Sequence, residues 1–431
     1  MSRRVLLAAG FFLAAGARLA AGEINENDLF SSPVLSTRPS VEASSAEEKP
    51  SVKFSGAVTS VVALDGVRGS TENIHHSFLV GNGFLDARMK NDMKAFANLE
   101  TQIDPQASTT TTFYVREMFF DFNLDRRVYV RTGKQVLQWG RCTLWNPTDL
   151  VNVEKPTFIR KIGYREGAYG LKLHAPFGAE QNIYGFLDTG NAPTTDKLGG
   201  ALKYEFLVGR TEMAFSGWAK KTYNPVAGYD FSTRVGDVDI VGEASVSKGD
   251  NVKKVFLDDG FLDVRRNEKE WAPLAAVNVS KGFPLGNFND RLKVAGEFFY
   301  NQPGYQKHFF DDASVYPLRN SLAIPSAPPP ASTKAGLLLA DNLYTMNYFS
   351  KYYGALFTSV GRFIVTDMTL NMNYIRNIDD GTGIVSAGVT YTNLADLTLG
   401  ALVNLLTGPR NGEYTTLKAV YDVQLTAGIS F

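Results

Sequence analysis

The last eleven residues of the chain alternate strictly between apolar and polar positions. The apolar or aromatic positions are Tyr421, Val423, Leu425, Ala427, Ile429 and Phe431. The positions between them hold polar residues or Gly. A period of two is that of a β-strand with one apolar face. Because the alternation runs to the final residue, where soluble chains usually fray into polar sequence, this segment indicates a strand whose apolar face stays covered to its end.

Similar alternation recurs upstream in windows of about ten residues, the length a tilted strand needs to cross the hydrocarbon of a membrane. Counting back from the C-terminus gives about sixteen strands, an even number, as single-chain bacterial barrels have. They lie near residues 413–431, 395–406, 383–393, 363–376, 346–360, 290–301, 271–282, 236–248, 211–221, 199–208, 181–188, 167–175, 127–138, 113–123, 84–99 and 52–63. We therefore expect an all-β fold, a transmembrane antiparallel β-barrel of about sixteen strands, with counts from fourteen to eighteen open.

The first 22 residues have the features of a secretory signal peptide. Arg3 and Arg4 precede an apolar run over 5–17, which is too short to span a bilayer, and Ala20 and Gly22 provide a small-residue cleavage site. Residues 23–51 are rich in Ser, Pro and Glu and are predicted to form a flexible periplasmic leader. The expected organisation is a signal peptide at 1–22, the leader at 23–51 and the barrel at 52–431.

Composition excludes several classes of function. The 44 basic and 44 acidic residues balance, so the basic surplus of a nucleic-acid binder is absent. The single Cys142 cannot form an intramolecular disulfide. The four His residues are scattered, and the sequence has neither a Gly-x-Ser-x-Gly motif nor a Gly-rich phosphate loop. We expect no enzyme activity, no catalytic residue, no metal site and no cofactor.

The connections between the predicted strands should alternate between short periplasmic turns and longer external loops. The long segments 249–270 and 302–345 fit external loops. In the N-terminal half the alternation fails, because a tight turn at 124–126 falls where a loop is expected and the long segment 139–166 falls where a turn is expected. Either the strand count is wrong there or 139–166 folds inside the barrel.

Two segments carry a family resemblance. The last strand resembles the C-terminal strand of bacterial outer-membrane barrels, which ends on Phe and is recognised by the barrel assembly machinery. Residues 131–156, RTGKQVLQWGRCTLWNPTDLVNVEKP, resemble a partly uncharacterised set of porin-like outer-membrane barrels. The matching positions are Arg131, Gly133, Gln135, Trp139, Gly140, Asn146, Pro147, Asp149 and Asn152. The resemblance implies a barrel in the outer membrane of a Gram-negative bacterium that passes solutes and has no enzymatic activity.

Charged residues at lumen-facing positions and in the 139–166 segment are the candidate pore-lining and constriction residues, because rings of charge set selectivity in channels. They are Glu117, Asp121, Arg131, Arg141, Asp149, Glu154, Lys155, Arg160, Arg165, Lys293 and Glu297. An aromatic surface for solutes would use Trp139, Trp145 and Tyr164. The alternative for the segment is a rigid turn that only closes one end of the barrel.

The sequence thus predicts a porin or channel for passive diffusion of small polar or charged solutes, narrowed by 139–166. One alternative is a surface protein with a blocked lumen, whose loops 249–270 and 302–345 bind host or neighbouring molecules. A soluble secreted β-protein is a third alternative. The expected partners are outer-membrane lipid and lipopolysaccharide, the barrel assembly machinery through Phe431, small solutes and, as an open alternative, further copies of the chain. We expect no nucleic-acid partner.

Overall fold

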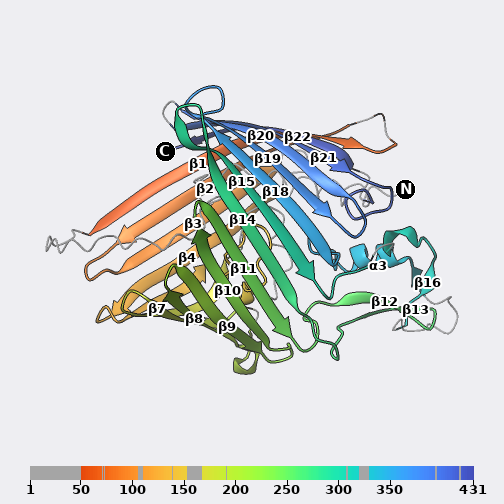
Figure 1. Cartoon of the computed structure of the whole chain (residues 1–431), viewed down its shortest axis with the longest axis horizontal. Coiled ribbons are helices and arrows are strands. Elements are labelled where there is room, and N and C mark those ends of the chain that lie inside the picture. The colour runs from red at the N-terminus through yellow and green to blue at the C-terminus, as the bar shows by residue number, and fades with distance from the viewer. Residues whose placement is uncertain are drawn as a thin grey trace.

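A computed structural model describes residues 50–69, 71, 73–104, 110–137, 139–152, 167–190, 192–306, 309–319, 330–393, 396–416 and 419–431. Within these residues, eighteen strands form one antiparallel sheet (Figure 1). The strands are β1 (Ser51–Val67), β2 (Ile74–Arg88), β3 (Lys94–Asp104), β4 (Thr110–Leu124), β5 (Val128–Gln135), β6 (Ala168–Phe177), β7 (Gln181–Asp188), β8 (Gly199–Val208), β9 (Thr211–Lys220), β10 (Val226–Val235), β11 (Val238–Ser247), β14 (Leu274–Leu285), β15 (Phe288–Asn301), β18 (Tyr352–Gly361), β19 (Met368–Asn377), β20 (Gly383–Asn393), β21 (Leu397–Thr407) and β22 (Ala419–Ser430).

The sheet closes on itself, since β1 pairs with both β2 and β22. At the seam the Gly56 amide donates to the carbonyl of Phe431 at 2.8 Å, and the Phe431 amide donates to the carbonyl of Gly56 at 2.9 Å. Closure removes the free edges that an open sheet would leave unpaired in a membrane. The all-β antiparallel barrel expected from the sequence is therefore confirmed.

The strand count exceeds the expected sixteen by two, at the upper end of the range left open. The predicted strand 84–99 is in fact the end of β2 and the start of β3, joined by a turn in which Asn91 and Asp92 have φ of 62° and 57°. The other missed strand is β10, over Val226–Val235. Its sequence does alternate, because Ala227, Tyr229 and Phe231 are separated by Gly228 and Asp230.

Counting β10 also resolves the failed alternation of loops and turns. The turn at 125–127 now lies at the same end of the barrel as the short connections 178–180, 209–210 and 236–237. The connection 136–167 lies at the opposite end, with the long connections 248–273 and 302–351. Because outer-membrane barrels have short periplasmic turns and longer external loops, 136–167 is an external connection.

The two faces of the sheet differ in chemistry. Val58, Leu425 and Ile429 are exposed on the outer face, whereas Asp422 and Gln424, the alternate residues of β22, are buried on the inner face. The same division holds along β15, where Phe298 is exposed and its neighbours Glu297 and Phe299 are buried. An apolar exterior around a polar interior is the pattern of a membrane barrel and the inverse of a soluble sandwich.

Within the described residues, no helix is both long and apolar enough to cross a membrane.

The external connections 248–273 and 302–351 pack on each other beyond the barrel, at the end opposite the C-terminus (Figure 1). They contain the hairpin β12 (Lys254–Asp258) and β13 (Phe261–Arg265), the short strands β16 (Tyr316–Pro317) and β17 (Ala331–Ser332), and helix α3 (Lys334–Ala340). Thr333 caps the helix by accepting the Gly336 amide at 2.9 Å. Leu262, Leu338 and Phe349 form their shared buried core.

Candidate functional site: a loop bound to the inner wall

The segment 139–152 contacts the inner wall of the barrel over most of its length. It follows β5, where the Val136 amide donates to Glu117 at 2.9 Å. Trp139 then packs against Phe186, Ala201 and Trp218, which are inward-facing residues of β7, β8 and β9. The contacts continue along β10, β11 and β15, so this external connection turns back into the barrel rather than away from it.

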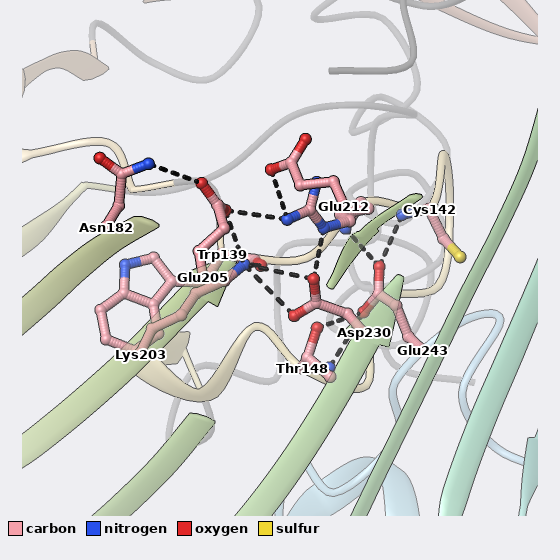
Figure 2. A network of polar contacts seen from close by, with 10 residues as sticks. Trp139, Cys142, Thr148, Asn182, Lys203, Glu205, Glu212, Asp230 and Glu243 are labelled. Atoms are coloured by element: carbon pink, nitrogen blue, oxygen red, sulfur yellow. Dashed lines mark hydrogen bonds and ion pairs between the residues drawn. The ribbon is translucent and has the colours of Figure 1, made fainter. Parts of the chain in front are cut away.

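Glu243, on the inner face of β11, binds the segment on both sides of residues 143–145 (Figure 2). Its carboxylate accepts the amides of Arg141, of Cys142 at 2.6 Å and of Thr148 at 3.0 Å. The Thr148 hydroxyl also donates to it, at 2.7 Å. These contacts place the amides of a turn around a buried carboxylate, where hydrogen bonds to a charged acceptor are strong.

Glu297, on the inner face of β15, binds the middle of the segment in the same way. It accepts the amides of Thr143 at 2.9 Å, Leu144 at 3.1 Å and Trp145 at 2.7 Å. The side chain of Asn278 on β14 adds a fourth donor at 2.9 Å. Two wall carboxylates therefore accept six backbone amides from eight consecutive residues of the segment, 141–148.

Arg141 makes the third anchor. Figure 2 labels the three carboxylates with which it pairs. Its guanidinium pairs with Glu205 at 2.8 Å, with Glu212 at 2.7 Å and with Asp230, which come from β8, β9 and β10. Burial alone would lower the pKa of the Arg141 guanidinium, but Glu212 and Asp230 more than offset this and raise it above its ordinary value. Arg141 is therefore charged at any physiological pH and joins three adjacent strands to the loop.

Lys203 completes this network from β8. Its ammonium donates to the carbonyl of Trp139 at 2.8 Å and lies 3.2 Å from Oδ2 of Asp230. Three carboxylates and two cations thus share one buried site at the inner wall. Because buried charges need partners, each member depends on the others, and the loop supplies the second cation that the three carboxylates need.

The Trp and Asn-Pro-x-Asp positions of the family-like segment shape its turn. The Asp149 amide donates to the carbonyl of Asn146 at 3.0 Å, which closes the turn over Pro147. A Cβ on Gly140 would lie 2.5 Å from the Cβ of Asn146, so the turn requires Gly there. Asp149 itself is buried.

Trp139 and Trp145, expected as an aromatic surface for solutes, are both buried. The Trp145 ring stacks on Phe299 with centroids 5.5 Å apart, and its Nε1 donates to the carbonyl of Asn347 at 2.7 Å. Neither ring offers a free face to a solute. Their role in this structure is to pack the segment against the wall and, for Trp145, against the external loop that contains Asn347.

The remaining candidates on the strands face inward. Arg131 on β5 and Asp121 on β4 are cross-strand partners and pair at 2.6 and 2.8 Å, with the guanidinium above the ring of Phe119. Lys293 lies on the inner face of β15, four residues before Glu297. Five candidates lie outside the described residues: Glu154, Lys155, Arg160, Tyr164 and Arg165.

Sequence reasoning found Arg141 and Glu297 but missed their partners. The missed residues are Lys203, Glu205, Glu212, Asp230 and Glu243. A signal was present, because a carboxylate within an apolar strand such as Val238–Ser247 must face the inside of a membrane barrel. What the sequence could not show is that a distant loop binds these carboxylates.

No group of three or more His, Cys, Asp or Glu in the described residues is arranged to hold a metal ion.

The sequence matches no family model and no curated protein. Solved structures do match. OccK2 (OpdF) of Pseudomonas aeruginosa, solved in complex with glucuronate, is 10% identical, with 88% of this chain and 98% of that chain covered and a TM-score of 0.52. OccAB1 of Acinetobacter baumannii is 10% identical over 88% and 96% of the two chains, with a TM-score of 0.51. OpdL of P. aeruginosa is 7% identical over 88% and 98%, with a TM-score of 0.51.

These neighbours are outer-membrane porins of the OccK/OprD type. The chain is thus a closed antiparallel membrane β-barrel. Its fold is that of the bacterial outer-membrane porins, and together with its apolar outer face this places the protein in the bacterial outer membrane. At these identities the likeness concerns the fold, and it does not extend to what the neighbours bind.

Proposed function

We propose that the protein is a channel through which small polar or charged solutes diffuse across the outer membrane, and that the segment 139–166 narrows its lumen. The observation that carries the proposal is the binding of 139–152 to the inner wall by Glu243, Glu297 and Arg141. A loop that only closed one end of the barrel would not need two wall carboxylates and a buried Arg to position it.

The charges explain how the narrowing can be stable. The wall carboxylates accept hydrogen bonds from backbone amides of the loop and pair with Arg141. These contacts fix the position of the loop along the barrel axis. Arg131, Asp121 and Lys293 also face the lumen, where both signs of charge favour polar solutes over apolar ones. Passive diffusion of this kind requires no cofactor and no chemical step.

The ends of the chain support the same assignment. We propose that residues 1–22 are removed on export, that 23–51 remain as a periplasmic leader, and that Phe431 is the contact for the barrel assembly machinery. The Phe431 side chain is exposed on the outer face of the seam, where a partner can reach it.

The test is single-channel conductance of the refolded mature barrel in a planar bilayer, under salt gradients. The mature parent barrel should form channels that open steadily. A variant of it that lacks 141–163 should have a higher conductance and a different ion selectivity. A control variant, Arg234→Ala, removes an Arg at the periplasmic end that pairs with Asp239, and it should conduct like the parent.

Two results would contradict the proposal. A folded, inserted barrel that never conducts would favour the alternative of a surface protein whose lumen is blocked. A deletion that leaves conductance and selectivity unchanged would show that the segment does not narrow the lumen. Thermal unfolding of each variant identifies any deletion that has failed to fold.

A further inference from the structure

An aromatic row lies on the outer wall at the external ends of four neighbouring strands and their connections. It consists of Trp271, Tyr300, Tyr352 and Tyr374. Each alternates with inward residues, since Phe299, Tyr353 and Ile375 are buried on the lumen side. The Tyr300 and Tyr352 rings contact each other across β15 and β18 with centroids 5.4 Å apart. Trp271 is more than half exposed.

The residues below the row are exposed and fully apolar. Phe298, Leu356 and Met372 follow on the same strands and the same outer face, toward the periplasm. Aromatic girdles with polar atoms mark the membrane–water interface, and aliphatic residues mark the hydrocarbon. The row therefore marks the height of the headgroups in the outer leaflet.

Arg376 is at this height on the outer face of β19, between the inward Ile375 and Asn377. Its side chain is exposed, and no carboxylate of the described residues pairs with it. Its Nη1 donates to the hydroxyl of Tyr374 at 3.1 Å. Since that oxygen is the acceptor, the Tyr374 hydroxyl keeps its own proton to donate, and the guanidinium has further N–H donors.

The external connection that follows β19 passes close to this pair. A Cβ on Gly381 would be 3.7 Å from Nη2 of Arg376 and 3.8 Å from Pro409, so Gly381 lies between Arg376 and the connection from β21 to β22. The outer wall thus has one Arg and a phenolic donor at the level of the lipid headgroups.

We propose that Arg376, with Tyr374, binds the phosphate of a phosphorylated lipid headgroup in the outer leaflet. The guanidinium and phenol supply the donors that phosphate oxygens accept, and charge-assisted bonds of this kind are among the strongest in proteins. Tyr300 and Tyr352 contact the lipid where its headgroup meets its acyl chains. The site is independent of the lumen, so it stands whether or not the barrel conducts.

The test measures thermal unfolding of the mature barrel in dodecyl maltoside as lipid A is added. Lipid A should raise the Tm of the parent in a saturable way. Arg376→Gln should raise the half-saturating lipid concentration about tenfold, as expected for loss of a charge-assisted hydrogen bond, and Tyr374→Phe should raise it less. The matched control is Arg362→Gln. Arg362 lies in the periplasmic turn between β18 and β19, with its guanidinium above the ring of Phe288.

Each other outcome would overturn the proposal. Equal half-saturation for the parent and Arg376→Gln would show that the site does not bind the lipid. An equal effect of Arg362→Gln would show only a general response to charge. Equal stabilisation by fully dephosphorylated lipid A would show that the site does not recognise the phosphate. Equal stabilisation by inorganic phosphate would show that the site does not require the lipid. Tyr374→Phe keeps the charge, so it still tests the site if Arg376→Gln folds poorly.

Discussion

Glu413 and Asn347 belong to different external connections, yet Oε1 of Glu413 accepts the Asn347 amide at 3.0 Å. The carbonyl of Asn347 in turn accepts Nε1 of Trp145 at 2.7 Å, and its side-chain oxygen accepts the hydroxyl of Tyr414 at 2.5 Å. One residue thus joins the connection before β22, the long connection before β18 and the loop bound inside the barrel. The external connections are thus hydrogen-bonded to the segment that forms the proposed constriction.

The first prediction concerns pH and these hydrogen bonds. Burial raises the pKa of the Glu413 carboxyl to about 8, and nearby Asp380 raises it too, against the lowering effect of Tyr353, Asn377 and Asn347. Because the unfolded pKa is about 4.3, the folded loops bind the proton more tightly. This stabilisation is fully present below about pH 4.3 and is lost as pH rises through about 8, by at most about 1.4 kcal/mol per pH unit.

Hydrogen exchange of the amides of 344–350 should therefore become faster, relative to the intrinsic rate, between pH 5 and pH 9. Glu413→Gln is uncharged at every pH, so it should flatten this dependence. Tyr344, Tyr353, Asp380 and Tyr414 also face this carboxyl from the packed elements. Asp380→Asn is the control, and it should shift the transition to lower pH without removing it. A variant Glu413→Gln with an unchanged pH profile would assign the effect to another group.

The second prediction tests the carboxylate at the middle of the loop. Glu297→Ala leaves the amides of Thr143, Leu144 and Trp145 without their acceptor. A buried unsatisfied amide costs about 1–3 kcal/mol, and water entering the site relieves part of this. We expect a lower Tm and noisy, flickering single-channel current. Glu297→Gln keeps one acceptor oxygen and should be intermediate. Quiet current from a folded Glu297→Ala barrel would show that the loop does not depend on this anchor.

How far the sequence predicts this structure depends on the range of the interactions. Alternation within β20, β21 and β22 is local, because a strand with one lipid-facing side must repeat every two residues, and those elements are predicted well. The break between β2 and β3 depends on two residues in left-handed conformations, Asn91 and Asp92, inside a stretch that otherwise alternates. Such a turn is easily read as a continuous strand.

The site is harder to predict because its contacts span the chain. Glu243 is about a hundred positions from Cys142, and Glu297 is about a hundred and fifty from Trp145. A lumen-facing Glu looks the same in sequence whether it meets solute or binds a loop. The sequence therefore predicts Glu297 as a pore-lining residue, and in the structure this side chain is buried and binds the loop. Only the closed barrel brings these strands around the loop.

The third prediction concerns Arg141. Arg141→Ala leaves Glu205, Glu212 and Asp230 without their main cation in a buried site. Breaking a buried ion pair by removing one partner costs about 3–5 kcal/mol. Arg234→Ala, which breaks an exposed pair with Asp239, should cost no more than about 1 kcal/mol. Urea unfolding from lipid vesicles measures both. Equal losses would mean that the three carboxylates do not need Arg141.

The fourth prediction concerns Gly133, the Gly of the family-like Arg-x-Gly-x-Gln pattern. It has a φ of +121°, and a Cβ there would clash with the carbonyl oxygen of Met118 on β4. Gly133→Ala should therefore lower stability by about 1–3 kcal/mol, because the backbone must leave a conformation that only Gly adopts easily. Gly81→Ala is the matched control, since a Cβ there meets open space on the outer face, and it should stay within about 0.5 kcal/mol of the parent. Thermal unfolding measures both variants. An unchanged Tm for Gly133→Ala would contradict the prediction, because it would show that the pairing of β4 with β5 accommodates a Cβ at this position.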